Sequence, residues 1–181
     1  MKLVILDRNG TLNEHREDFV KSDIEWMPLP GALEAVARLN HAGWHVVIAS
    51  NQSGLGRGLF DVASLNAMHA KMHKMLAAVG GRVEAVFYCP HSPDEGCECR
   101  KPKPGMLLEG ARKFAVDTKR SFMVGDRWRD IEAGQHAGCR TIFIDGGYED
   151  KEPARPADAR VHSLRQAVDW ILEECRKGVM R

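Results

Sequence analysis

Short hydrophobic runs alternate along the chain with longer segments whose hydrophobic residues recur at helical spacing. This alternation predicts a parallel β-sheet covered by helices, because a parallel strand needs a long crossover to reach its neighbour. We expect strands at 2–6, 44–49, 83–88, 121–124, 141–144 and near 161. We expect helices at 31–42, 62–79, 105–114, from after 126 to about 137, and at 164–175.

These elements describe a single doubly wound, Rossmann-like α/β domain over residues 1–181. No inserted cap domain is visible, since the longest early connection, 13–30, has only one hydrophobic cluster at 26–29. In sheets of this type ligands bind beyond the carboxyl ends of the strands. Substrate specificity should therefore come from the loops at 13–30, 50–59 and 89–103.

The composition narrows the class of protein. The 26 basic and 25 acidic residues leave a net charge of +1, which gives no reason to expect nucleic acid or an acidic membrane as a partner. No hydrophobic run approaches the ~20 residues of a membrane span, and the first run, at 3–6, is too short for a signal sequence. We expect a cytoplasmic protein, and a monomer, because nothing in the sequence requires a second subunit.

Polar side chains stand at or beyond the ends of four predicted strands. In chain order they are Asp7, then Ser50 with Asn51 and Gln52, then Lys101, then Asp126 with Asp130. Carboxylates suit magnesium, and hydroxyl, amide and ammonium groups suit phosphate oxygens. Each residue has an ordinary alternative, since Asp7 could cap a turn and Asp126 and Asp130 could cap a helix. Such caps explain the residues singly but not the set.

This combination resembles the four motifs of the haloacid dehalogenase superfamily. The resemblance implies that Asp7 is a nucleophile that forms an aspartyl phosphate, while Ser50 and Lys101 hold the transferring phosphoryl group. It also implies a magnesium ion bound by Asp7, the backbone carbonyl of Asn9 and Asp126, with Asp130 in support. Fixed positive charge at such a site offsets the repulsion between phosphate and the attacking carboxylate.

Asn9 departs from the pattern of that superfamily. The resemblance implies an aspartate here, which protonates the leaving oxygen and later activates water, and an amide cannot carry a proton in this way. Three explanations stay open. Asparagine was introduced in place of aspartate, or it is natural and turnover is slow or uses another proton donor, or the chain binds its ligand without turnover.

A second motif brings together three cysteines and a histidine in a loop at about 89–103. Cys89, His91, Cys97 and Cys99 form a complete tetrahedral set, which is typical of structural zinc with no open position for water. Reduced cysteines in a surface loop are the alternative. Because Lys101 follows directly, a zinc ion would fix the loop that carries it. We interpret Cys139 and Cys175 as packing thiols.

The cysteine loop and the segment 50–58 together resemble the branch of heptose bisphosphate phosphatases and histidinol phosphatases, over about residues 2–146. The short chain and Arg57 favour a heptose bisphosphate, a sugar phosphate whose C7 phosphate would be removed. There are two alternatives. The chain is a histidinol-phosphate phosphatase, or it is a sugar-phosphate binding protein with impaired catalysis. The resemblance implies substrate contacts from Asn51, Gln52, Arg57, Arg100 and Lys101.

We interpret two further features of the helices as structural, and a third stays open. We expect His69 and His73 to face solvent, because no third metal ligand lies near them in the sequence. The methionines at 68, 72 and 75 follow core spacing. Trp128 either covers the site or simply begins a helix.

Overall fold

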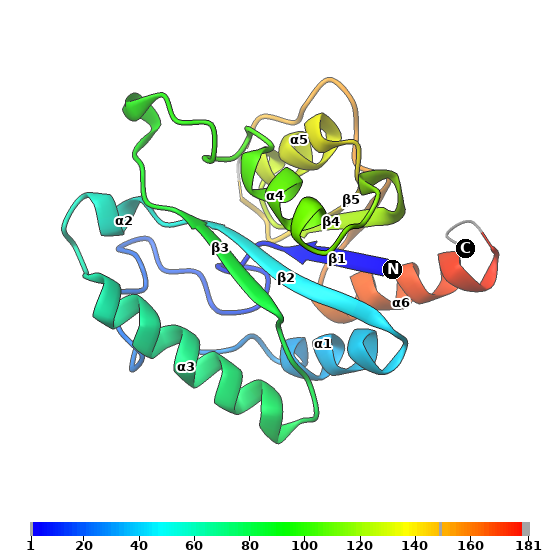
Figure 1. Cartoon of the computed structure of the whole chain (residues 1–181), viewed down its shortest axis with the longest axis horizontal. Coiled ribbons are helices and arrows are strands. Elements are labelled where there is room, and N and C mark those ends of the chain that lie inside the picture. Colours follow the sequence, from blue (N-terminus) through cyan, green and yellow to red (C-terminus); the bar gives the residue numbers. More distant parts are fainter. Residues whose placement is uncertain (1, 149, 179–181) are drawn as a thin grey trace.

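The computed structural model describes residues 2–148 and 150–178. Six parallel strands form one sheet in the order β3-β2-β1-β4-β5-β6 (Figure 1). The strands are β1 (Lys2–Leu6), β2 (Trp44–Asn51), β3 (Ala85–Cys89), β4 (Ser121–Gly125), β5 (Arg140–Ile144) and β6 (Ala159–Val161). The order reverses around β1, so the chain winds outward in both directions from a central strand. This is the doubly wound sheet that the sequence predicts.

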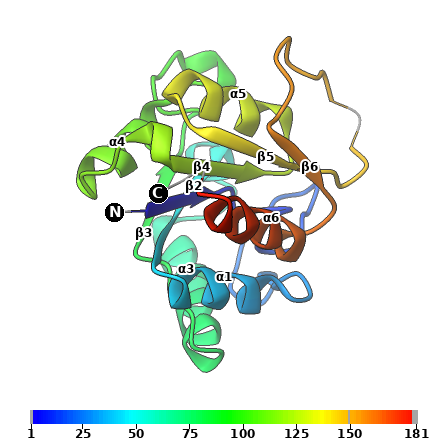
Figure 2. The ribbon, with the colours of Figure 1, turned by 90° about the vertical axis from the view of Figure 1, so that its right-hand side faces the viewer.

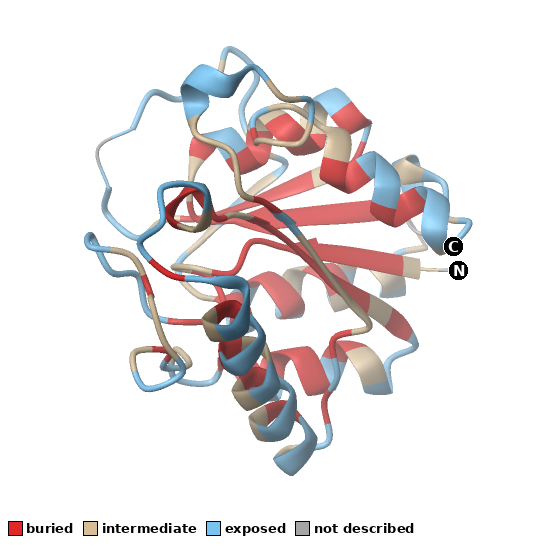
Figure 3. Cartoon of the chain, turned by 60° about the vertical axis from the view of Figure 1, so that its left-hand side comes forward, coloured by how far each residue is buried: buried red, intermediate tan, exposed pale blue. Residues whose placement is uncertain are grey.

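Helices cover both faces of the sheet (Figure 2). The helices are α1 (Ala32–His41), α2 (Ser53–Gly56), α3 (Val62–Ala78), α4 (Gly105–Lys113), α5 (Trp128–Ala137) and α6 (Leu164–Arg176), with short 3-10 turns η1 (Pro93–Glu95) and η2 (Thr118–Arg120). Helices α1, α3 and α6 pack on one face, and α4 and α5 pack on the other. The outer surfaces of the helices are exposed, while the central strands between them are buried (Figure 3).

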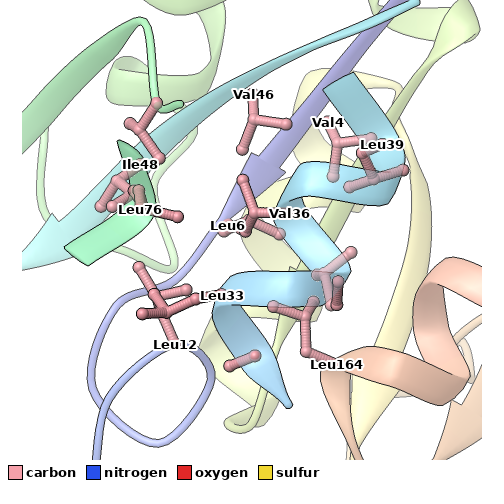
Figure 4. Packing of buried hydrophobic residues seen from close by; sticks show 14 of the residues in the cluster. Val4, Leu6, Leu12, Leu33, Val36, Leu39, Val46, Ile48, Leu76 and Leu164 are labelled. Carbon is pink, nitrogen blue, oxygen red and sulfur yellow. The ribbon is translucent and has the colours of Figure 1, made fainter. Parts of the chain in front are cut away.

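The core has two layers because successive strand residues point to opposite faces. In β1, Val4 and Leu6 face the layer of α1, α3 and α6, whereas Leu3 and Ile5 face α4 and α5. Figure 4 shows the first layer, where the hydrophobic side of α1 meets the strands. Burial of both faces explains why the strands appear as continuous hydrophobic runs.

The predicted fold is confirmed, with differences at the ends of elements. Strand β3 begins at residue 85 rather than 83, and β2 runs on through the polar residues 50 and 51. Helix α2 and the two 3-10 turns were not predicted. Each is about one turn long, so none can show a hydrophobic period. Trp128 begins α5 and stacks on Phe143, with ring centroids 3.8 Å apart.

No helix in the described part of the chain is long and apolar enough to cross a membrane. The methionine prediction is also confirmed for α3, where Met68 and Met72 are fully buried and Met75 packs against the same core.

Candidate active site

Parallel pairing brings four chemically important segments to one edge of the sheet. Asp7 directly follows β1, and its backbone N–H donates to the carbonyl of Val124 in β4 (2.9 Å). Ser50 is the second-to-last residue of β2, and Asp126 directly follows β4. The turn after Asp7 passes close to Asp126, because a Cβ atom at Gly10 would collide with the Asp126 carboxylate. Gly10 also has a φ of 82°, which favours glycine.

Lys101 links the carboxylates at this edge. Its ammonium group lies 2.8 Å from Asp7 Oδ1 and 2.7 Å from Asp130 Oδ1, and it donates to the backbone carbonyl of Ala49 at 2.7 Å. Lys101 is 1% exposed. Burial alone would lower the pKa of Lys101, but the charges of Asp130 and Asp7 raise it, so the side chain is a fixed cation.

Three buried carboxylates, those of Asp7, Asp126 and Asp130, have oxygens within 4.8 Å of one another. Both oxygens of Asp126 are buried without a hydrogen-bond partner in the described structure. Burial, followed by the charges of Asp7 and Asp130, raises the pKa of Asp126 to about 9. Burial also pushes the pKa of Asp7 upward, but Lys101, Asp126 and Arg129 together outweigh it and hold that pKa below its ordinary value. Paired oxygens that lack partners fit a hard divalent cation such as magnesium.

Asn9 lies beside this cluster, with its side-chain oxygen in a cradle of three N–H donors. Arg8 donates to Asn9 Oδ1 from Nε (3.2 Å) and Nη2 (3.0 Å), and Asn13 donates from Nδ2 (3.0 Å). None of these three groups can accept a hydrogen bond, so the oxygen of the amide must face them. A guanidinium presents the same two-pronged face to a carboxylate. The cradle therefore has the donors that an aspartate at this position would use.

Arg8 is completely buried, which the sequence did not predict. Its partners are neutral groups, since Nη1 lies 3.1 Å from His69 Nε2 and 3.8 Å from Met68 Sδ. Burial lowers the pKa of Arg8 to about 10, and burial with the charge of Arg8 lowers the pKa of His69 to about 4. The prediction that His69 faces solvent is wrong, because its neutral ring accepts from Arg8. His73 is exposed as expected.

The segment after β2 holds Ser50 and Lys101 in place. Gln52 is 2% exposed and donates from Nε2 to Ser50 Oγ at 2.7 Å. The side-chain amide of Asn51 pairs with the backbone of Lys101, accepting from its N–H at 3.0 Å and donating to its carbonyl at 3.2 Å. Asn51 thus connects the end of β2 to the loop that carries Lys101.

A cavity of about 330 Å³ opens above this edge, and Asp7, Asn9 and Asn51 form part of its lining. Arginines dominate the rest of the lining, namely Arg16, Arg57, Arg100, Arg127 and Arg129. So strong a concentration of positive charge fits a ligand with more than one anionic group.

Several residues of the cavity lining were missed from the sequence: His15, Arg16, Glu17, Phe19, Arg127 and Arg129. They stand in loops or at a helix start, where no hydrophobic period shows which way a side chain faces. Arg127 lies over the ring of Tyr148 at 3.8 Å, and His15 packs edge-on against the same ring. Partial burial and the charge of Arg127 lower the pKa of His15.

The four predicted zinc ligands also come together. Cys89 Sγ lies 2.8 Å from Cys99 Sγ, 3.5 Å from Cys97 Sγ and 3.4 Å from His91 Nδ1. All four ligand atoms lie within 4.8 Å of one another, and the cysteines are free thiols. Three sulfurs and one imidazole nitrogen at this spacing could hold a tetrahedral zinc ion. Cys139 is buried, and Cys175 packs against the core.

The cysteine loop contacts the cavity through Arg100. Its Nη1 donates to the carbonyl of His91 at 3.2 Å, while its side chain also lines the cavity. Lys103 donates to the carbonyl of Cys97 at 2.7 Å. The conformation of the loop therefore sets the positions of the cationic residues that follow it.

Comparison with known proteins agrees with this fold and site. A family model described as HAD-hydrolase-like matches residues 98–167. A curated relative from Bordetella bronchiseptica, a D-glycero-β-D-manno-heptose-1,7-bisphosphate 7-phosphatase, is 50% identical over 96% of this chain and 99% of its own length. The phosphatase of the same name from Pseudomonas aeruginosa is 46% identical over 80% of this chain and 82% of its own.

Solved structures give the same result. The crystal structure of the D,D-heptose 1,7-bisphosphate phosphatase from B. bronchiseptica, complexed with magnesium and phosphate, has a TM-score of 0.88 at 47% identity. It covers 96% of this chain, and 99% of its own length is matched. The fold and the strand-end site define a HAD-like hydrolase. Within that class, the identity and coverage show that the chain belongs to the family of D-glycero-D-manno-heptose-1,7-bisphosphate 7-phosphatases. The resemblance inferred from the sequence is confirmed.

Proposed function

We propose that this chain is a magnesium-dependent phosphatase that removes the C7 phosphate of D-glycero-D-manno-heptose 1,7-bisphosphate, at a rate limited by Asn9. The observation that carries the proposal is the buried ion-paired cluster of Asp7, Lys101 and Asp130 at the sheet edge, beneath an arginine-lined cavity. The names of the relatives supply the substrate.

In this proposal Asp7 is the nucleophile. Lys101 keeps Asp7 ionised, since an ammonium group 2.8 Å from its carboxylate favours the charged form. The Asp7 carboxylate attacks phosphorus, the bond to the sugar oxygen breaks, and water then hydrolyses the aspartyl phosphate. Ser50 and Lys101 supply hydrogen bonds to the phosphoryl oxygens, and Gln52 orients the Ser50 hydroxyl.

The magnesium site would consist of Asp7, Asp126 and the backbone carbonyl of Asn9, with Asp130 holding Lys101 and the N-terminus of α5. Asp130 Oδ2 accepts from the backbone N–H of Arg127 at 3.1 Å, which fixes its orientation. When bound, magnesium adds positive charge at the phosphoryl oxygens. Zinc, held by Cys89, His91, Cys97 and Cys99, would be structural, because the four ligands leave no open position.

The arginines that line the cavity fit a substrate with two phosphates. One phosphate has to reach Asp7, so the second lies among the arginines of the lining. Arg57 and Arg100, which stand on separate loops, can each bind phosphate oxygens with two N–H groups. Asn51 lines the same cavity while it anchors the backbone of Lys101.

Asn9 cannot act as a general acid or base. Loss of such a group typically costs ~100- to 10,000-fold in rate. The leaving sugar oxygen is a poor leaving group without a proton, and the water that attacks the aspartyl phosphate lacks a base. We therefore expect slow steady-state turnover by the chain with Asn9.

The test compares this chain with Asn9→Asp on both anomers of the heptose bisphosphate and on histidinol phosphate. We expect Asn9→Asp to release phosphate ~100- to 10,000-fold faster from a heptose bisphosphate. Asn9→Ser is the matched control, because it removes the amide without supplying a carboxylate. Preference for histidinol phosphate would replace the proposed substrate. Tight heptose binding with no turnover in Asn9→Asp would instead identify a sugar-phosphate binding protein.

We also propose that residues 1–181 act as one domain, as a monomer, in the cytoplasm. The free cysteines of the described chain support a reducing compartment. Sedimentation equilibrium of the zinc-loaded protein tests the monomer, and a concentration-dependent mass would contradict it.

A further inference from the structure

Asn9 precedes Gly10, and this is the one asparagine–glycine pair in the sequence. The side chain of glycine is a hydrogen atom, so nothing shields its backbone nitrogen from the preceding side chain. Such pairs are the sites at which an asparagine amide is most readily attacked by the next backbone nitrogen. Glycine cannot be exchanged here, because it has a φ of 82° and a Cβ atom would collide with Asp126.

The surroundings of Asn9 favour attack on its side-chain carbonyl carbon. Three N–H donors converge on Oδ1, two of them from the buried guanidinium of Arg8 and one from Asn13. Donors fixed on a carbonyl oxygen stabilise the negative charge that develops there when a nucleophile adds to the carbon. The cradle thus has the form of an oxyanion hole directed at the Asn9 amide.

We propose that Asn9 is a self-modification site, at which the folded chain converts its own asparagine to aspartate. The Gly10 nitrogen loses its proton to solvent base and bonds to Asn9 Cγ, the Cγ–Nδ2 bond breaks, and ammonia leaves with a proton from water. Water then opens the resulting succinimide ring. The net reaction consumes one water and releases one ammonia, with no oxidant or reductant.

The cradle also determines the product. Water that adds to the former Asn9 Cγ gives aspartate, whereas water that adds to the backbone carbonyl of residue 9 gives isoaspartate. In the chain without magnesium, Arg8 and Asn13 polarise only the first of these carbonyls. In an unfolded chain isoaspartate is the major product, so the fold should reverse this preference.

Two contacts affect the rate and the driving force of the conversion of Asn9 to aspartate. The Gly10 N–H donates to the carbonyl of Asn13 at 2.7 Å, and this bond must open before the nitrogen can reach Cγ, which slows conversion in the folded chain. The product places a carboxylate against Arg8, whose partners are otherwise neutral. A charged acceptor strengthens that hydrogen-bonded pair.

The consequence rests on the proposed phosphatase function: conversion supplies the carboxylate that a general acid–base step needs. A chain synthesised with asparagine would then gain activity as it ages. The modification itself does not depend on that function, and mass spectrometry detects it without any substrate.

The experiment incubates freshly purified, zinc-loaded chain at mildly alkaline pH in H₂¹⁸O and follows the peptide containing residue 9 for days. Electron-transfer fragmentation separates aspartate from isoaspartate. The same chain unfolded in urea is the reference, and Asn9→Gln is the control, since its longer side chain disfavours ring closure. We expect aspartate to exceed isoaspartate in the folded chain, with one ¹⁸O at residue 9, and the reverse ratio in urea.

Retention of the amide in the folded chain, over the time in which the unfolded chain converts, would overturn the proposal. A majority of isoaspartate in the folded chain would overturn it as well. Phosphate release is measured on the same samples. Conversion with a matching rise in activity supports both proposals, whereas conversion without activity supports the modification and refutes the phosphatase.

Discussion

At the scale of single residues, the proposed chemistry depends on the balance of negative and positive charge in the buried cluster. Asp7, Asp126 and Asp130 place three buried carboxylates close together, and Lys101 is the buried cation that pairs with two of them. A buried carboxylate without a partner is costly, so the cluster needs a further positive charge. Magnesium would supply that charge at Asp126, whose oxygens have no other partner in the described structure.

Replacement of this cation tests its role. We expect Lys101→Met to abolish phosphate release in the Asn9→Asp background, and to lower the free energy of unfolding by ~3–5 kcal/mol, because two carboxylates lose a buried partner. Chemical denaturation and phosphate release are the measurements. Lys177→Met is the matched control, since Lys177 is exposed and its pair with Glu174, at 3.8 Å, should contribute less than ~1 kcal/mol. Equal effects of the two substitutions would contradict the assignment.

The raised pKa of Asp126 predicts how magnesium stabilisation varies with pH. The pKa is ordinary in the unfolded chain and about 9 in the metal-free fold, so the fold holds an extra proton between these values. Stability of the metal-free protein therefore falls as pH rises through this window toward about 9. Magnesium replaces the proton, so the increase in Tm that it causes should grow with pH.

Scanning fluorimetry of the protein with and without magnesium, from neutral pH upward, measures this effect. Asp126→Asn is the control, because an amide of the same shape has no proton to lose and should remove most of the pH dependence. A magnesium-induced shift in Tm that stays constant with pH in the unsubstituted chain would contradict the assignment of Asp126.

At the scale of elements, the cysteine loop between β3 and α4 transmits its conformation to the site. It begins at Cys89, the last residue of β3, and its backbone is held by Arg100 and Lys103. Asn51, at the end of β2, anchors the backbone of Lys101 in the same loop. A zinc ion in this loop would fix the cations without touching the substrate.

Removal of one ligand should separate this structural role from catalysis. We expect Cys97→Ser to lose zinc by elemental analysis, to lower Tm, and to raise KM through the displaced Arg100, since zinc binding contributes directly to folding. Cys175→Ser on α6 is the matched control and should keep its zinc. A metal-free protein of unchanged stability would falsify the zinc assignment.

At the scale of the whole molecule, much of the fold could be predicted because one physical signal repeats along the chain. Strands buried on both faces appear as hydrophobic runs, and their ends carry the polar residues, so the edge of the sheet identifies Asp7, Ser50 and Asp126. The cluster of Cys89, His91, Cys97 and Cys99 could be predicted from residue type and spacing. Single-turn elements such as α2 carry no period and were missed.

Other parts of the site depend on the path of loops, which no local pattern encodes. A charged residue after a strand, such as Arg8, would be expected to face solvent, yet it is enclosed beneath Asn9 and α3. His15, Arg127 and Arg129 reach the cavity only because the turn after β1 and the start of α5 meet above the sheet. The departure at Asn9 was visible in the sequence, but its cradle of donors was not.

The central claim is that Asp7 takes up the phosphoryl group. A phosphate ester with a good leaving group, such as p-nitrophenyl phosphate, needs no proton from residue 9 for the first step, whereas hydrolysis of the aspartyl phosphate still lacks its base. Rapid-quench measurement on freshly purified, magnesium-loaded chain should therefore show a burst of nitrophenol stoichiometric with protein, with the phosphate on the peptide that contains Asp7. Asp7→Asn should show no burst. Absence of a burst in the unsubstituted chain, or phosphate on any other residue, would contradict the account.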